Sequence, residues 1–220
     1  MTDEREILRR VSEYYTRKLE EFGATPRGVD WNSSESQQVR FTQLLSVCEG
    51  DDSFRINDVG CGYGARVDRL GALPGCAEYT GYDVAPAMIE AARGRYRERA
   101  GVRFTTSAED VPVAHYSVAS GIFGVKGDAG AETWLAYVHR TLDWIRERSE
   151  RGFAFNALTA YSDPSRMRPD LFYADPHALF EWCYRRYSRS VALLHDYGVW
   201  EFTIRVRLEA AADGSLQTVG

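Results

Sequence analysis

Apolar residues recur along this chain with two different spacings. Near the N-terminus, from Asp3 to Glu20, apolar side chains stand every three or four positions among charges, which is typical of an amphipathic helix. A loop from Phe22 to Asn32 follows, rich in glycine and proline. Ser34 and Gln37 then have the spacing of a capping box, which predicts a second helix that ends at Gly50.

Beyond the second helix, short apolar runs alternate with amphipathic segments. This pattern predicts strands separated by helices. The predicted strands are Phe54–Val59, Glu78–Asp83, Val102–Thr105, Tyr116–Ser120 and Phe153–Leu158. The predicted helices between them are Ala65–Leu70, Pro86–Arg97 and Glu132–Arg148. Strands that alternate with helices indicate a doubly wound α/β fold with a parallel sheet.

The last part of the chain has a different pattern. A polar connection, Thr159 to Pro176, leads into a helix through Phe180, and two strands follow, Val191–His195 and Trp200–Leu208. The turn between these strands predicts a hairpin, which would add an antiparallel strand to the parallel sheet.

The bulk composition limits the class of protein. The chain has 220 residues, of which 44% are hydrophobic and 27% charged, as in ordinary globular proteins. We expect a helical cap or lid over residues 1–50 and one compact core over residues 51–220. No apolar run is long enough to cross a bilayer and the N-terminal segment does not resemble a secretory signal, so we expect a cytoplasmic protein that does not associate with membranes.

Charge and cysteine usage argue against two further classes. The formal net charge of -5 gives no overall attraction to a phosphate backbone, so we expect no nucleic-acid partner. The four cysteines form no CxxC pair and no cluster with histidine, so we expect reduced thiols and no metal site.

Three glycines occupy five positions directly after the first predicted strand. In "DVGCGYG", Gly60, Gly62 and Gly64 permit a sharp turn and let a ligand lie against bare backbone, although a tight turn without a ligand is the alternative. Asp83 closes the next strand, where a carboxylate can accept hydrogen bonds from both hydroxyls of a ribose. Asp58 precedes the first glycine and could orient the loop or meet a cationic group of a ligand.

Two cofactor classes are compatible with the glycines. Gly60, Gly62 and Ala65 satisfy the spacing of a dinucleotide-binding turn, so NAD stays open on the glycines alone. The whole order, from Asp58 through the glycine loop and Asp83 to an acidic pair after the third strand, resembles the S-adenosylmethionine site of class I methyltransferases. This resemblance extends from about Phe54 to Leu208.

The resemblance implies a fold and a set of cofactor contacts. It implies a Rossmann-like mixed sheet of seven strands in the order 3-2-1-4-5-7-6, with the last strand antiparallel. It places the glycine loop at the amino-acid part of S-adenosylmethionine, Asp83 at the ribose, and Ala108, Glu109 and Asp110 at the adenine. The expected cofactor-binding residues are Asp58, Gly60, Cys61, Gly62, Gly64, Asp83, Val84, Met88, Ala108, Glu109, Asp110, Ser120 and Gly121.

Three further segments carry a narrower resemblance. "GATPRGVDWNSSESQQVRF", "ASGIFGVK" and "HDYGVWEFTIRV" are similar to a bacterial group of class I methyltransferases that act on small molecules. That group more often reads SGIFN after the fourth strand, and Gly124 stands where the asparagine is expected. A substrate contact by that side chain is therefore not expected in this chain.

Methyl transfer from a sulfonium needs mainly alignment and a dry pocket, and a base only where the acceptor must lose a proton. His195, at the end of the sixth strand, is the candidate base, although a histidine that only ends a hairpin strand is the commoner case. Asn156, in the fifth strand, could orient an acceptor or simply bond to nearby backbone. The candidate substrate-binding residues are Tyr15, Trp31, Arg40, Phe123 and Tyr173.

The sequence thus predicts methyl transfer from S-adenosylmethionine to an oxygen or nitrogen of a small polar metabolite or natural-product intermediate. The segment "SGIF" replaces the Asn-Pro-Pro-Tyr-like segment expected in an enzyme that methylates amino groups of DNA or glutamine. Two alternatives stay open, an NAD-dependent oxidoreductase and a catalytically silent cofactor-binding protein. Monomer and homodimer are both compatible with the sequence.

Overall fold

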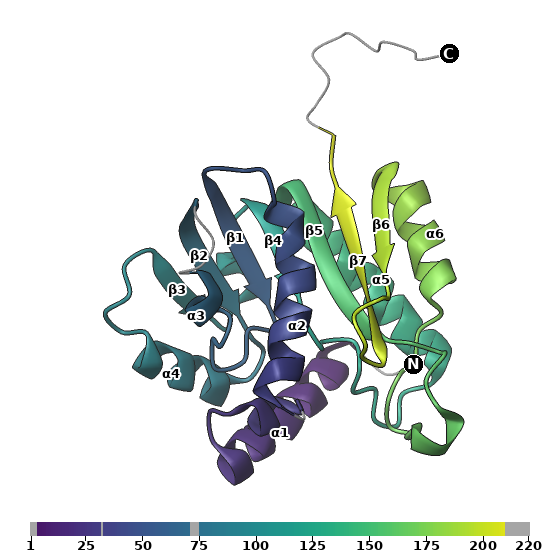
Figure 1. Ribbon diagram of the computed structural model, residues 1–220. Coiled ribbons are helices and arrows are strands. Elements are labelled where there is room, and N and C mark those ends of the chain that lie inside the picture. The colour runs from purple at the N-terminus through teal and green to yellow at the C-terminus, as the bar shows by residue number, and fades with distance from the viewer. Residues whose placement is uncertain (1–3, 32, 71–74, 210–220) are drawn as a thin grey trace, which may run out of the picture.

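A single mixed sheet runs through the computed structural model, which describes residues 4–31, 33–70 and 75–209 (Figure 1). Its strands are β1 (Phe54–Val59), β2 (Cys76–Tyr82), β3 (Val102–Thr105), β4 (Ala114–Ala119), β5 (Ser149–Leu158), β6 (Ser190–Leu194) and β7 (Glu201–Arg207). Their order is β3-β2-β1-β4-β5-β7-β6, and β7 is antiparallel to both of its neighbours. The predicted fold class and strand order are confirmed, and β7 is reversed because a short turn joins it to β6.

Helices cover both faces of the sheet. They are α1 (Glu4–Phe22), α2 (Ser34–Leu45), α3 (Val67–Leu70), α4 (Pro86–Arg95), α5 (Ala131–Glu147) and α6 (Pro176–Arg186). The buried side chains of α2, α3 and α4 form one apolar cluster with the sheet, and those of α5 and α6 form a second cluster. Among the described residues, no helix is both long enough and apolar enough to cross a membrane.

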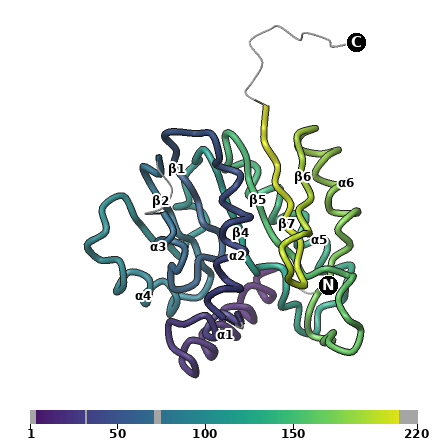
Figure 2. Tube along the Cα trace, viewed as in Figure 1, coloured from purple at the N-terminus to yellow at the C-terminus, as the bar shows by residue number. Residues whose placement is uncertain are grey.

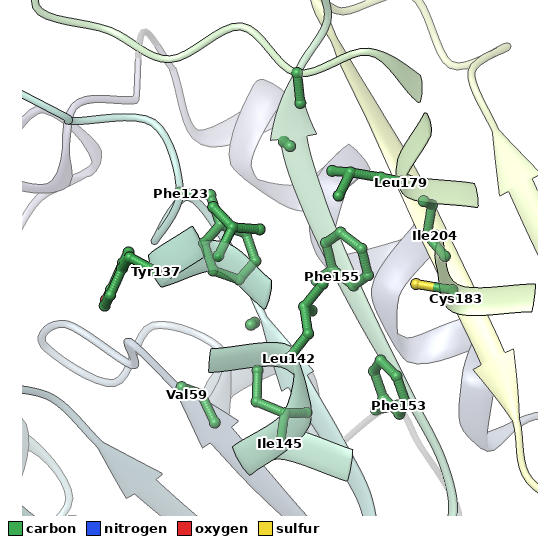
Figure 3. Packing of buried hydrophobic residues seen from close by; sticks show 14 of the residues in the cluster. Val59, Phe123, Tyr137, Leu142, Ile145, Phe153, Phe155, Leu179, Cys183 and Ile204 are labelled. Carbon is green, nitrogen blue, oxygen red and sulfur yellow. The ribbon is translucent and has the colours of Figure 1, made fainter. Parts of the chain in front are cut away.

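Strand β5 is buried on both faces because helices cover the sheet on both sides. Phe153 and Phe155 point toward α5 and α6, where they pack with Leu142, Ile145 and Cys183 (Figure 3). Ala154, between them, faces the opposite side, as the period of two in a strand requires. A near-continuous apolar run is the sequence signature of such an inner strand.

Helix α1 lies apart from both layers, along the edge where the parallel strands end (Figures 1 and 2). Its residue Ile7 is buried in the cluster of α5 and α6, and α1 also contacts α4. A 3-10 helix, Pro26–Val29, follows it and packs against it. Helix α2, in contrast, packs on the sheet face as part of the core.

Several element boundaries differ from the predicted ones. The N-cap of α2 is Ser33, not Ser34: its backbone is extended and its Oγ accepts a hydrogen bond from the backbone N–H of Ser36 at 3.1 Å. Both serines are good N-cap residues, and the capping-box spacing from Ser34 to Gln37 favoured the wrong one. Strand β5 begins at Ser149, because pairing with β4 extends it beyond its apolar run. Two predicted limits lie outside the described residues: Asp3, where the first helix was predicted to begin, and Asn32, where the loop after it was predicted to end.

The glycines of the loop after β1, the glycine loop, satisfy packing constraints within the protein itself. Gly60 has a φ of +73°, and a Cβ on it would lie 2.1 Å from Cγ2 of Ile122. Gly64 has a φ of +82°, and a Cβ there would lie 2.9 Å from the Tyr96 ring. Both positions therefore require glycine for backbone conformation and for space.

This crowding predicts unequal costs for two glycine substitutions with similar φ. Gly23→Ala, at φ +68° with open space around it, should lower the free energy of unfolding by about 1–2 kcal/mol through backbone strain. Gly60→Ala adds the collision with Ile122, and overpacking of this kind costs about 1–3 kcal/mol more. Urea unfolding of both variants measures the difference; equal losses would contradict the crowding.

Candidate active site

A cavity of about 720 Å³ follows the edge of the sheet where the parallel strands end. Its walls come from α1, from the segment that leads into α2, from the loops after β1, β2 and β4, and from the start of β7. Most of the residues singled out in the sequence lie along it. These are Tyr15, Trp31, Arg40, Asp58, Gly60, Cys61, Gly62, Asp83, Val84, Met88, Ala108, Ser120, Gly121 and Asn156.

Six candidates do not line this cavity, namely Gly64, Glu109, Asp110, Phe123, Tyr173 and His195. Phe123 lies in the core instead, with its ring edge-on to Phe155 at 5.7 Å between centroids. His195 is exposed and its ring lies between those of Tyr161 and Phe202. The sequence placed Phe123 and His195 near the ends of strands, but it did not determine the direction in which their side chains point.

Asp83, directly after β2, is buried at the cavity wall. Its Oδ2 accepts a hydrogen bond from the backbone N–H of Gly62 at 2.8 Å, and its Oδ1 accepts one from Ala85 at 2.9 Å. Burial raises the pKa of this carboxyl to about 6, even though the two backbone donors act in the opposite direction. Asp83 thus joins the glycine loop to the start of α4, and each oxygen keeps a free lone pair for a ligand.

Asp58 is held by protein groups on both oxygens. The guanidinium of Arg66 donates to its Oδ1, and the hydroxyl of Tyr79 donates to its Oδ2 at 2.6 Å. The cation–carboxylate pair is almost completely buried beneath the glycine loop. Of the two roles considered for Asp58, the contacts match orientation of the loop.

Asn156 fixes the loop after β4. Its Oδ1 accepts a hydrogen bond from the backbone N–H of Gly121 at 2.7 Å, and its Nδ2 donates to Oγ of Ser120 at 3.2 Å. Gly121 has a φ of +73°, and a Cβ there would lie 2.9 Å from the Trp31 ring. Asn156 therefore sets the loop against which the Trp31 indole packs.

Sequence reasoning missed two groups of cavity residues. Glu201, the first residue of β7, is buried and paired with Arg40 at 2.7 Å. Its only signal in the sequence was an acidic residue at the beginning of an apolar strand. Residues of α5 also line the cavity, at Tyr137, Arg140 and Thr141. They stand at helical spacing among core positions, so the sequence offers no means of separating them from packing residues.

Two comparisons with known proteins identify the family. A model described as "Methyltransferase domain" matches residues 56–143, which include the glycine loop, Asp83 and the loop after β4. The chain is also 53% identical over 163 residues to the protein named "Putative methyltransferase Rv1506c" of Mycobacterium tuberculosis, a match that covers 74% of this chain and 98% of the relative. The chain therefore belongs to the class I S-adenosylmethionine-dependent methyltransferase family.

Solved structures share the fold at low sequence identity. A magnesium protoporphyrin IX methyltransferase from Synechocystis PCC 6803, with bound S-adenosylhomocysteine, has a TM-score of 0.62 at 10% identity and covers 94% of this chain and 100% of its own. The N-methyltransferase NodS from Bradyrhizobium japonicum WM9, with the same ligand, has a TM-score of 0.62 at 16% identity and coverages of 90% and 97%. These likenesses concern the fold alone.

The residues of this cavity fit S-adenosylmethionine, the cofactor of the family. The carboxylate of Asp83 can accept hydrogen bonds from ribose hydroxyls. Gly60 and Gly62 have no side chain, so a ligand can approach the backbone of the glycine loop. The volume also lies within the range of about 300–1,000 Å³ for pockets that enclose drug-sized ligands. Membership of a methyltransferase family, rather than the geometry, decides for the methyl donor over NAD.

The raised pKa of Asp83 predicts how cofactor binding depends on pH. If ribose hydroxyls donate to this carboxylate, protonation removes an acceptor, so affinity for S-adenosylhomocysteine should fall as the pH drops through about 6. The limiting slope is about tenfold per pH unit. Calorimetry from pH 5 to 7 measures it, and Asp83→Asn should give a weaker but flat profile. A flat wild-type profile would exclude Asp83 as the titrating contact.

Proposed function

We propose that this protein transfers the methyl group of S-adenosylmethionine to an oxygen or nitrogen of a small polar molecule. The observation that carries the proposal is that one cavity joins two polar ends. Asp83 and the glycine loop lie at one end, and the Arg40–Glu201 pair lies at the other. The cofactor supplies a methyl group already activated on a sulfonium, so the protein needs to align the acceptor and exclude water.

The chain's own residues serve these two tasks. The Asp58–Arg66 pair and the Asp83 bond to Gly62 hold the glycine loop in place. Asn156 holds the loop after β4, and the Trp31 ring packs against Gly121 in that loop. We infer that α1 and Trp31 form a lid that shields the reacting groups from water.

The dimensions and charge of the site favour a small acceptor. Residues of α1 form part of the cavity wall, and the volume of about 720 Å³ suits a cofactor with a small molecule rather than a polymer. The formal net charge of -5 adds no attraction for nucleic acid. One solved structure with this fold is named an N-methyltransferase. Oxygen and nitrogen both stay within the proposal, since the sequence leaves both open. We also propose a cytoplasmic location, as a monomer or homodimer.

The fold alone does not decide that methyl transfer occurs. The [4+2]-cyclase SpnF has a TM-score of 0.60 at 15% identity, with 86% of this chain and 74% of its own covered. Transfer is therefore tested directly, by incubating the protein with S-adenosylmethionine and a panel of small phenols, alcohols and amines. The expected result is S-adenosylhomocysteine together with a product heavier by one methyl group. Cofactor binding without turnover across the panel would favour a catalytically silent protein.

Removal of the Asp83 carboxylate tests the cofactor end of the cavity separately. Asp83→Ala should weaken binding of S-adenosylhomocysteine by about 1–3 kcal/mol, because ribose hydroxyls would lose their buried acceptor. Glu90→Ala, an exposed carboxylate on α4 outside the cavity, is the matched control and should change nothing. Unchanged affinity in Asp83→Ala, measured by calorimetry with melting temperature as a check of folding, would contradict the assigned role.

A further inference from the structure

Glu201 lies on the face of the sheet that α2 covers, because successive side chains of β7 point to opposite faces. Phe202, Ile204 and Val206 point into the core under α5 and α6, so Glu201 and Thr203 face the opposite side of the sheet. Strand β7 runs antiparallel to β5, with Glu201 opposite Leu158. The start of β7 therefore lies at the same edge as the ends of the parallel strands, and Glu201 lines the cavity there.

The carboxylate of Glu201 is buried but only half satisfied. Its side chain is 5% exposed, and its Oε1 pairs with Nη2 of Arg40 at 2.7 Å. Its Oε2 has no hydrogen-bond partner among the described residues. A buried carboxylate oxygen without a donor is costly, so a donor from a water molecule or a ligand is expected at this point.

Two further contacts hold Arg40 in place, although its Nε, like Oε2 of Glu201, has no hydrogen-bond partner among the described residues. Its Nη1 donates to the backbone oxygen of Ser36 at 2.6 Å, and its guanidinium lies over the Trp31 ring at 4.2 Å from the centroid. Such a fixed guanidinium holds the Glu201 carboxylate in one orientation. The free oxygen is thus a preorganised acceptor of hydrogen bonds.

The Glu201 carboxylate lies far from the cofactor end of the cavity. Four strand steps separate β2, which precedes Asp83, from β7, and at about 4.8 Å per step this is about 19 Å across the sheet. Tyr15 lines the space between, and the charges of Asp83 and Glu201 both add to the desolvation that raises the pKa of its phenol. Apolar side chains also stand near this ion pair: Leu158 is opposite Glu201 in the sheet, and the Trp31 ring lies under the Arg40 guanidinium.

We propose that Oε2 of Glu201 accepts a hydrogen bond from the methyl acceptor, and that this small molecule carries an amine or hydroxyl donor on an aromatic or aliphatic body. This inference rests on the proposed function, because it places the acceptor at the end of the cavity away from the cofactor. Glu201 is a substrate-binding residue in this assignment, and Arg40 is its positioning residue. The site selects against acceptors that offer only hydrogen-bond acceptors, because Oε2 would then stay unsatisfied.

Three probes of similar shape test the selection. Benzylamine carries a charged donor, benzyl alcohol a neutral donor, and acetophenone an acceptor only. With S-adenosylhomocysteine present, dissociation constants are measured by ligand-observed NMR titration. Benzylamine should bind at least about tenfold more tightly than acetophenone, with benzyl alcohol between them. If the wild-type protein does not prefer the two donors over acetophenone, the proposal is wrong.

Glu201→Gln should reverse the polarity of the site. The amide oxygen would face Arg40, which donates, and the amide NH2 would take the place of Oε2. The preference for benzylamine should therefore be lost, and acetophenone should bind several-fold more tightly than in the wild type. Glu201→Asp keeps the charge and should preserve the order of the three probes with weaker binding. A Gln variant with the wild-type order would overturn the assignment.

Controls separate this role from structural damage and from the proposed reaction. Thr203→Val changes the next residue on the same face of β7, which is buried, bonds to Tyr197 and does not line the cavity, so the probe order should not change. Retained affinity for S-adenosylhomocysteine shows that each variant is folded. Because probe binding needs no turnover, failure of methyl transfer and failure of donor selection are observed independently.

Discussion

The constraint on which this structure depends is that parallel strands end at one common edge. Helices cover both faces of the sheet, so polar side chains can gather only where strands pass into loops. Asp83 after β2, Asn156 near the end of β5 and the loop after β4 are brought together by this geometry. The reversed strand β7 adds Glu201 to the same edge from its beginning rather than its end.

Buried charges along this edge are compensated in different ways. Asp58 has a cation and a phenol as partners, so its carboxylate supports the glycine loop. Asp83 has backbone donors, and burial raises its pKa. Glu201 has a cation on one oxygen and no partner among the described residues on the other. The differences in compensation distinguish a supporting carboxylate from carboxylates suited to contact a ligand.

The chain pattern predicted the order of elements well, because periods of two and 3.6 report burial locally. It was less accurate at boundaries, as at Ser33 and Ser149, where capping and strand pairing decide the limits. Most cofactor-side candidates line the cavity, since they follow strands in a known order. Phe123 and His195 do not, because the twist of a loop decides which way a side chain points.

The sequence by itself determined the α/β class, the glycine loop and the carboxylate after the second strand, because these depend on residues close together in the chain. The identity of the methyl donor follows from that local order and from family membership. Only the tertiary structure decided that Arg40 and Glu201, from α2 and β7, form one buried pair at the cavity wall. Residues this far apart in sequence carry no common pattern, so their meeting depends on how α2 packs on the sheet.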